Sequence, residues 1–248
     1  MPFYGAKTQH RRQRFMESGG DYTENLVLWC RARSIPLGPD TLMDRWDDDS
    51  GNGDFGDQQT GAWKPILKAG LVNGMEGVRF DGVDDTLVVP YTRHGGKLSP
   101  STLTIFMVVI PRETTEAVYY LYHRNAVAIT WSAWAFEQED GQYKFRMEDN
   151  GISTNKLNLG AFAVGQAAIL EGKYDGATMS GRLNGGTSVS VGHSIYYGGN
   201  FDVYLGSHEN STWACQLDIV EVRIYNVALS SSQDARVLDR LNRDYAVF

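Results

Sequence analysis

The sequence contains few cysteines and no long apolar run, and each shortage excludes a class of protein. The two cysteines, Cys30 and Cys215, lie far apart without a C-x-x-C spacing, which indicates neither a disulfide framework nor a zinc site. Two buried free thiols are favoured, and a single disulfide is the alternative. The longest apolar run, Ile105–Ile110, has the length of a strand. Since a membrane helix needs about 18 apolar residues or more, no membrane span is expected.

Positive charge is also scarce. The 248 residues contain 23 Lys and Arg against 30 Asp and Glu, a net charge of −7. Nucleic acid is therefore not an expected partner, because binding to phosphates needs a basic surface. No apolar segment follows the basic N-terminal residues, so a secretory signal is not expected. We interpret residues 1–24 as a flexible arm that docks onto a partner through Lys7, Arg11, Arg12 and Arg14.

Glycine, in contrast, is abundant, with 27 residues against 7 prolines. Turns built on glycine, Asn and Asp favour many short strands. Asp140-Gly141 and Asn184-Gly185 are typical of two-residue hairpin turns. The predicted strands are Leu26–Arg31, Gly77–Phe80, Thr86–Val89, Leu103–Ile110, Val118–His123, Val127–Phe136, Tyr143–Met147, Ala167–Tyr174, Thr178–Leu183, Ser188–Val191, Asp202–Leu205 and Gln216–Tyr225.

Helical periodicity occurs only near the C-terminus. Ser230 and Gln233 match a capping box, and an apolar stripe follows, which predicts one short helix from about Ser231 to Tyr245. Many strands without alternating helices exclude a parallel α/β sheet and favour an all-β sandwich or barrel. We expect one such domain over residues 25–248.

Four segments, in order along the chain, resemble the LamG-like branch of the concanavalin A-like lectin/glucanase superfamily. They are Asn25–Trp29, the W-x-D-x-S-G-N-G pattern of Trp46–Gly53, the R-F-D-G-V-D-D segment of Arg79–Asp85, and Ile219–Ser230. The last segment is similar to the family's I-A-E-V-x-I-Y-N-R-A-L-S, although Val227 replaces its arginine. The resemblance implies a concanavalin A-like jelly-roll sandwich of two antiparallel sheets, with ligands met by loops or a concave face. It supplies no activity, because the superfamily includes glucanases, lectins and adhesion modules.

An acidic loop is the candidate cation site. Residues 48–53 match the first half of a calcium-binding loop, but Gln59 occupies the position of the bidentate glutamate, which excludes an EF-hand. The resemblance implies a structural calcium ion at this loop instead, with further carboxylates from the Asp81–Asp85 segment. The candidate ligands are Asp48, Asp49, Asn52 and Asp84. The alternative is that Asp49 and Asn52 cap their own turn without a metal.

No catalytic motif is present in the sequence. The E-x-D-x-x-E strand of the glucanases is missing, and Glu137 and Glu139, which come closest to it, are interpreted as a solvated strand end. No H-E-x-x-H or G-x-S-x-G motif occurs. The G-x-G-x-x-G match at Gly51–Gly56 is flanked by five aspartates that would repel a pyrophosphate. The chain is therefore predicted not to be an enzyme, while a catalytic site assembled from distant residues stays open.

Aromatic side chains form the second candidate surface. Those in predicted strands are expected in the core: Tyr119, Tyr120, Tyr122, Trp131 and Trp134. Those in loops are candidates for stacking on sugar rings: Trp63, Tyr196, Tyr197 and Trp213.

Three functions are compatible with these features: a glycan- or surface-binding module, a virion component, and a glycoside hydrolase or lyase. We favour a non-catalytic, oligomeric virion surface protein of phage or viral origin, such as a head-decoration, head-fibre or tail-associated protein. It would be made in the host cytoplasm, attach to other virion subunits through residues 1–24, and contact host glycans through the sandwich. This choice depends on the LamG-like resemblance combined with the absence of a recognisable secretory signal. The alternative is a separate carbohydrate-binding module that leaves the cell by a signal-independent route.

Overall fold

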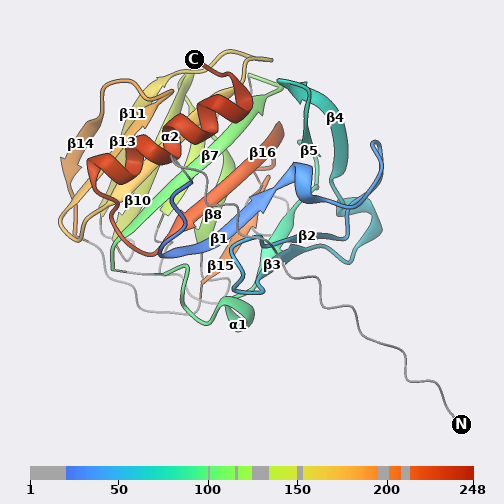
Figure 1. Cartoon of the computed structure of the whole chain (residues 1–248), viewed down its shortest axis with the longest axis horizontal. Coiled ribbons are helices and arrows are strands. Elements are labelled where there is room, and N and C mark those ends of the chain that lie inside the picture. The colour runs from blue at the N-terminus through green and yellow to red at the C-terminus, as the bar shows by residue number, and fades with distance from the viewer. Residues whose placement is uncertain are drawn as a thin grey trace, which may run out of the picture.

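The computed structural model describes residues 21–99, 101–114, 117–124, 134–149, 153–194, 201–207 and 213–248, and Figure 1 shows its arrangement. The strands of sheet A are β1 (Leu26–Arg31), β4 (Ile66–Val72), β5 (Met75–Asp81), β7 (Leu103–Pro111), β12 (Ala168–Tyr174), β13 (Thr178–Leu183), β14 (Val189–Gly192) and β16 (Gln216–Tyr225). The strands of sheet B are β2 (Arg45–Asp47), β3 (Phe55–Asp57), β6 (Leu87–Val89), β8 (Val118–Arg124), β9 (Trp134–Glu139), β10 (Gln142–Asp149), β11 (Ser153–Ala161) and β15 (Asp202–Leu205). Helices are α1 (Tyr91–His94), α2 (Ser231–Tyr245) and the 3-10 turns η1 (Ala32–Ser34) and η2 (Gly61–Trp63).

The two sheets have eight strands each. Sheet A has the order β14-β13-β12-β7-β16-β5-β4, with β1 paired to β16, and sheet B has the order β11-β10-β9-β8-β15-β6-β3-β2. Every pairing among the described strands is antiparallel. The predicted sandwich of two antiparallel sheets is therefore confirmed.

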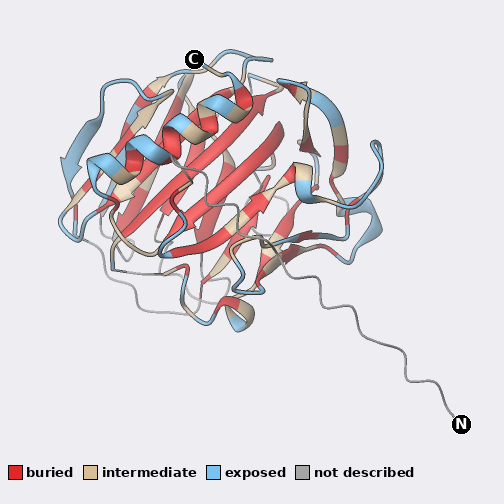
Figure 2. Cartoon of the chain, viewed as in Figure 1, coloured by how far each residue is buried: buried red, intermediate tan, exposed pale blue. Residues whose placement is uncertain are grey.

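The main core lies between the sheets, and helix α2 covers the outer face of sheet A (Figures 1 and 2). Strand β7 contacts both of these apolar layers, and all nine of its residues are buried. Ile105, Met107 and Val109 point into the main core, while Phe106 and Val108 pack in the cluster that includes α2. A strand buried on both faces is continuously apolar rather than alternating, which explains the apolar run in the sequence.

Helix α2 begins and ends at the predicted residues. The hydroxyl of Ser230 accepts a hydrogen bond from the backbone N–H of Gln233, and the Gln233 side chain accepts one from the Ser230 backbone. This capping box satisfies N–H groups that the first turn cannot pair within the helix. Both predicted free thiols are also confirmed, since Cys30 and Cys215 are buried and unpaired with each other.

One of the two predicted hairpin turns needs correction, and four strands were not predicted. The Asp140-Gly141 turn joins paired Glu139 and Gln142 as expected. Asn184 and Gly185 also have positive φ, but pairing resumes only at Val189, opposite Gly181, so this connection is longer than a two-residue hairpin. Strands β2, β3, β4 and β11 were not predicted, because they are short, contain glycine or are rich in polar residues.

The described fold begins at Asp21, ahead of the predicted boundary at residue 25. Tyr22 is buried, and its carbonyl accepts a hydrogen bond from the Tyr225 hydroxyl at 2.8 Å. Asp21, whose carboxylate binds Arg223, and Tyr22 therefore belong to the sandwich. The predicted arm residues Lys7, Arg11, Arg12 and Arg14 lie outside the described residues. No helix in the described ranges is long and apolar enough to cross a membrane.

Candidate functional site

Two of the predicted loop tryptophans are exposed at the same end of the sandwich. Trp63 ends η2 and is 39% exposed, and Trp213 precedes β16 and is 51% exposed. The Trp63 carbonyl accepts a hydrogen bond from Thr86 N–H at 3.1 Å, and the Trp213 carbonyl accepts one from Tyr119 N–H at 3.3 Å. Thr86 precedes β6 and Tyr119 lies near the start of β8, with β15 between these strands. Since adjacent strands lie about 4.8 Å apart, these two anchor points are about 10 Å apart.

An acidic loop lies at the same end. Asp81 ends β5 opposite Gln216, the first residue of β16, and the loop then leads through Asp85 directly to Thr86. Within the loop Val83 is 69% exposed, although it is apolar. We use the name loop-end surface for Trp63, Val83, Trp213 and the carboxylates of Asp81, Asp84 and Asp85. Val83 was not recognised from the sequence, where only its position in an otherwise acidic turn marks it.

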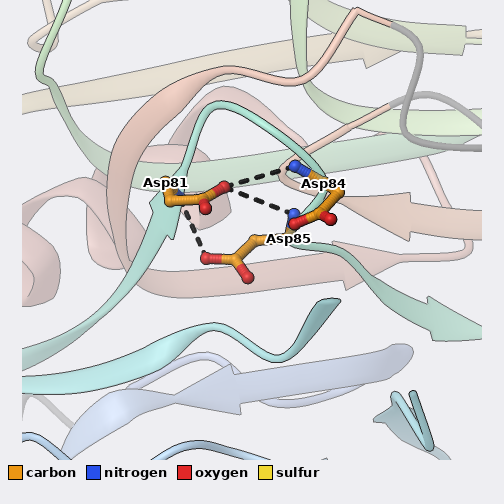
Figure 3. Close-up of side chains that lie close together, drawn as sticks. All are labelled: Asp81, Asp84 and Asp85. Atoms are coloured by element: carbon orange, nitrogen blue, oxygen red, sulfur yellow. Dashed lines mark hydrogen bonds between the residues drawn. The ribbon is translucent and has the colours of Figure 1, made fainter. Parts of the chain in front are cut away.

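The three carboxylates of this loop converge, as Figure 3 shows. Carboxylate oxygens of Asp81, Asp84 and Asp85 all lie within 4.8 Å of one another. Asp81 Oδ1 accepts hydrogen bonds from the backbone N–H groups of Asp84 at 3.3 Å and Asp85 at 3.4 Å, and Asp85 Oδ2 accepts one from Asp81 N–H at 2.9 Å. Burial and then the neighbouring charge of Asp81 raise the pKa of Asp85 to about 6. The loop is therefore ordered by its own backbone and concentrates negative charge.

The predicted calcium ligands do not form one group. Of the four, Asp84 lies with Asp81 and Asp85; among the described His, Cys, Asp and Glu residues, no comparable group contains Asp48 or Asp49. The donor chemistry of the Asp81–Asp85 loop suits a hard cation, because carboxylate oxygens are the ligands that calcium prefers. The same oxygens also accept the backbone hydrogen bonds described above.

The loop that contains Asp48, Asp49 and Asn52 fastens strand β1 instead. Asp48 Oδ1 accepts hydrogen bonds at 2.8 Å from the backbone N–H groups of Trp29 and Ser50. Asn52 Nδ2 donates to the Leu26 and Val27 carbonyls, each at 3.2 Å. Asp49 pairs with Arg31 at 2.9 Å. These contacts give the polar residues of the loop a structural role without a metal. They differ from the alternative expected from the sequence, because Asp48 caps the turn while Asp49 and Asn52 bind strand β1.

The strand aromatics divide between the two faces of sheet B. Tyr120 and Trp134 lie in the main core, as predicted. Tyr122 packs with Ala135 and Tyr204 in a small cluster on the opposite face, and half-buried Tyr119 packs against it. The prediction of buried core aromatics is confirmed for Tyr120, Tyr122 and Trp134, although Tyr122 belongs to this separate cluster, and it is wrong for Tyr119, which is only half-buried. Trp131, Tyr196 and Tyr197 lie outside the described residues.

The prediction of a solvated strand end is wrong for Glu137. Its side chain is 2% exposed on the outer face of sheet B, where it forms ion pairs with Arg146 at 3.3 Å and Lys156 at 2.8 Å. Glu148, also buried, binds the same Arg146 guanidinium. Sequence reasoning missed this cluster because alternation alone does not show which strands supply the compensating cations. Glu139 does remain partly exposed, beside Lys144 and Lys156.

A hollow of about 400 Å³ lies at the opposite end of the sandwich. Its lining residues are Asn155, Gly176, Ala177, Gly192, His193 and Ser194. These residues offer polar groups but no flat aromatic carbon face other than the buried His193 ring. The loop-end surface therefore has the stronger features for stacking on a sugar.

Comparison of the sequence with protein-family models and with curated proteins found no match. Comparison of the fold with solved structures found similar sandwiches. The receptor binding domain of botulinum neurotoxin C/D mosaic serotype matches with a TM-score of 0.66 at 12% identity, over 88% of this chain and 52% of that chain. The binding domain of Paraclostridial Mosquitocidal Protein 1 matches with a TM-score of 0.64 at 15% identity, over 88% of this chain and 53% of that chain.

A Trypanosoma rangeli sialidase in complex with sialic acid also matches, with a TM-score of 0.61 at 14% identity, over 89% of this chain and 33% of that chain. The chain thus spans about half the length of the two toxin domains and about a third of the sialidase. Because the identities are low, these similarities establish the β-sandwich fold alone.

Proposed function

We propose that this chain is a non-catalytic binding module that recognises glycans through the loop-end surface. The observation that carries the proposal is the pair of exposed tryptophans. Trp63 and Trp213 come from distant segments, yet their backbones are fixed at the same end of β6 and β8, the two strands that flank β15, while both residues stay partly exposed. Binding residues are typically placed this way, on loops held by a rigid scaffold.

The chemistry of the loop-end surface suits a sugar. Exposed indole rings present flat apolar faces to the C–H groups of a pyranose, and an indole N–H can donate to a hydroxyl. The carboxylates of Asp81 and Asp84 can accept hydrogen bonds from sugar hydroxyl groups. Anchor points about 10 Å apart would allow both rings to contact one oligosaccharide. The net negative charge of the loop favours a neutral glycan over an acidic one, because like charges repel.

The similar structures support binding as the general role. Two of them are named as a binding domain and a receptor binding domain. Each contains a sandwich of the type found here. That the ligand is a glycan is part of our proposal, and it depends on the chemistry of the loop-end surface.

A glycan array with the full chain tests the proposal, followed by titration calorimetry on the best glycan. We expect Trp63→Ala and Trp213→Ala each to weaken binding by about tenfold, the loss that corresponds to about 1.4 kcal/mol of aromatic contact. Phe248→Ala is the matched control, because it removes another exposed ring, 55% exposed, outside this surface. Unchanged affinity in both tryptophan variants, or a flat array, would contradict the proposal.

The absence of catalysis is part of the same proposal. The buried carboxylates Glu137 and Glu148 are bound by Arg146, so neither is positioned as an unpaired acid beside a free nucleophile. Incubation of the bound glycan with the protein should release no sugar. Release that is abolished in Glu137→Gln would show instead that the outer face of sheet B is a glycosidase site.

The virion setting stays a prediction from the sequence. It is favoured by the cluster of basic residues before Asp21 in an otherwise acidic chain. Deletion of residues 2–20, which leaves the packed residues Asp21 and Tyr22 in place, should abolish incorporation into a particle while the fold persists. Normal incorporation of the deleted chain would exclude the docking arm.

A further inference from the structure

Strand β14 is an edge strand without charge. It ends sheet A on one side, and each of its residues, Val189 to Gly192, is exposed. The other described strands that have a single partner all carry charge: Lys68 in β4, Arg31 in β1, Arg45 and Asp47 in β2, and Lys156 in β11. Charged residues on edge strands prevent unwanted pairing with other chains. Residues 183–194 contain no Lys, Arg, Asp or Glu, so this protection is missing at β14.

The inner face of β14 leaves apolar surface in solvent. Val191 pairs with Met179, which is fully buried in the main core, and Val189 pairs with Gly181. Cross-strand partners point to the same face of a sheet, so both valines lie on the core side. They are nevertheless 38% and 39% exposed. Among the described residues, Asn155 of β11 approaches this edge and donates a hydrogen bond to the Gly192 carbonyl at 3.3 Å, yet both valines stay partly exposed.

The register of β14 shows which backbone groups are available there. His193 N–H donates to the Ala177 carbonyl at 2.8 Å, so this residue faces β13 with its hydrogen-bonding groups. Hydrogen-bonded and non-hydrogen-bonded positions alternate in an antiparallel pair. Val191 and Val189 therefore bond to β13, whereas the N–H and C=O of Ser190 point away from it, toward the open edge.

We propose that β14 is the interface between two copies of this chain, which pair antiparallel about a twofold axis at Ser190. Ser190 would exchange both backbone hydrogen bonds with Ser190 of the second copy, and Val189 would face Val191. Val189 and Val191 would occupy non-hydrogen-bonded positions, where facing side chains are closest, so the four valines of the two copies would cover each other's apolar surface. Sheet A would then continue from one copy into the other.

A second copy fits this edge because the strand is self-complementary. Twofold pairing at Ser190 places serine opposite serine and valine opposite valine, with no charge buried or brought against a like charge. Pairing of two copies at β4 or β11 would bring lysine side chains into the interface, and β2 is only three residues long with a charge at each end. Strand β14 therefore permits self-association without desolvating charged groups, which the other edges would require.

Disulfide cross-linking of the full chain tests both the interface and its register. In the proposed dimer the two Ser190 Cα atoms are about 5.5 Å apart, a spacing that a disulfide can bridge. Oxidised Ser190→Cys should therefore run as a covalent dimer on non-reducing electrophoresis. Ser188→Cys is the matched control, since residue 188 faces residue 192 of the partner and should not cross-link to its own copy. The native cysteines are buried, so they should contribute no background.

Light scattering after gel filtration provides the second measurement. The wild type should be a dimer, and Val191→Lys should raise the dimer dissociation constant by about tenfold or more. Val164→Lys makes the same change at a valine that is 46% exposed away from this edge, and it should leave the dimer intact. A monomeric wild type, cross-linking at residue 188 rather than 190, or an unaffected Val191→Lys dimer would each overturn the proposal.

Discussion

Arg223 and Glu221 form a fully buried ion pair on β16, with Arg223 Nε donating to Glu221 Oε1 at 2.5 Å. The same carboxylate oxygen accepts from Trp29 Nε1 at 2.5 Å, and its other oxygen accepts from the Tyr245 hydroxyl. Burial by itself lowers the pKa of Arg223, but the charges of Glu221 and then Asp21 outweigh it and raise the pKa. One carboxylate therefore joins β1, β16 and helix α2.

Glu221→Ala should be severely destabilising, because it removes one of the two carboxylates that pair with the buried Arg223 charge and leaves the Trp29 N–H and the Tyr245 hydroxyl without their acceptor. We expect a loss of about 3–5 kcal/mol in the free energy of unfolding, measured by urea denaturation. Asp44→Ala is the control, since it breaks the Lys64 ion pair at a carboxylate that is 65% exposed. Exposed pairs contribute about 1 kcal/mol or less. Similar losses in both variants would contradict the importance assigned to the buried network.

The raised pKa of Asp85 predicts a specific pH dependence of stability. In the folded state the pKa of Asp85 is about 6, compared with an ordinary value of 3.8 for an aspartate. The folded state therefore binds more protons than the unfolded state between these values, and this carboxyl group makes folding less favourable as pH rises from about 4 to 6. Asp85→Asn keeps an acceptor for Asp81 N–H but cannot ionise. Its melting temperature should exceed that of the wild type at pH 7, and the difference should shrink as pH falls to 4. If the difference in melting temperature between the variant and the wild type stays constant from pH 4 to 7, the pKa of Asp85 is not raised.

Calcium addition distinguishes the two candidate cation loops. If the Asp81–Asp85 loop binds calcium only when folded, a hundredfold excess of calcium over Kd should increase the free energy of unfolding by about 2.7 kcal/mol. The melting temperature should therefore be higher with calcium than with chelator. Asp84→Asn should abolish this calcium-dependent increase. Asp48→Asn removes a charge from the other loop but keeps an Oδ1 acceptor for the N–H groups of Trp29 and Ser50, so it should keep the calcium-dependent increase. The reverse result would assign calcium to the loop at residues 48–53. If calcium does not raise the melting temperature of the wild type, neither loop holds a stabilising calcium ion.

Gly82 should be essential for the shape of the acidic loop. Its φ is +78°, and a Cβ at this position would lie 2.8 Å from the backbone nitrogen of Gln216. Gly165 is the matched control, with a φ of +79° and no atom near its Cβ position. Gly165→Ala should cost about 1 kcal/mol from backbone strain alone, whereas Gly82→Ala should cost about 2–4 kcal/mol because the clash adds to it. Equal losses in denaturation would mean that the loop yields to the added methyl group.

Local sequence signals predicted the elements whose cause is itself local. The capping box of Ser230 and Gln233 marked the start of α2, and β-branched and aromatic runs identified strands such as β15 and β16 with their observed bounds. Strand β11, S-T-N-K-L-N-L-G-A, was missed because polar residues on its outer face obscure the alternation. Strand β4 was missed because Gly70, with positive φ, interrupts its register.

The sequence by itself determined the fold class, one capped helix and the short list of loop tryptophans, because these depend on turn chemistry and periodicity within a few residues. Only the tertiary structure decided that Trp63 and Trp213 share one end of the sandwich, since hydrogen bonds to Thr86 and Tyr119 across three strands place them there. It also decided that Asp48 fastens β1 and that Glu137 is buried among cations. The physical reason is that antiparallel pairing brings together residues far apart in the chain, and no local pattern records which strands become neighbours or which one is left at an edge.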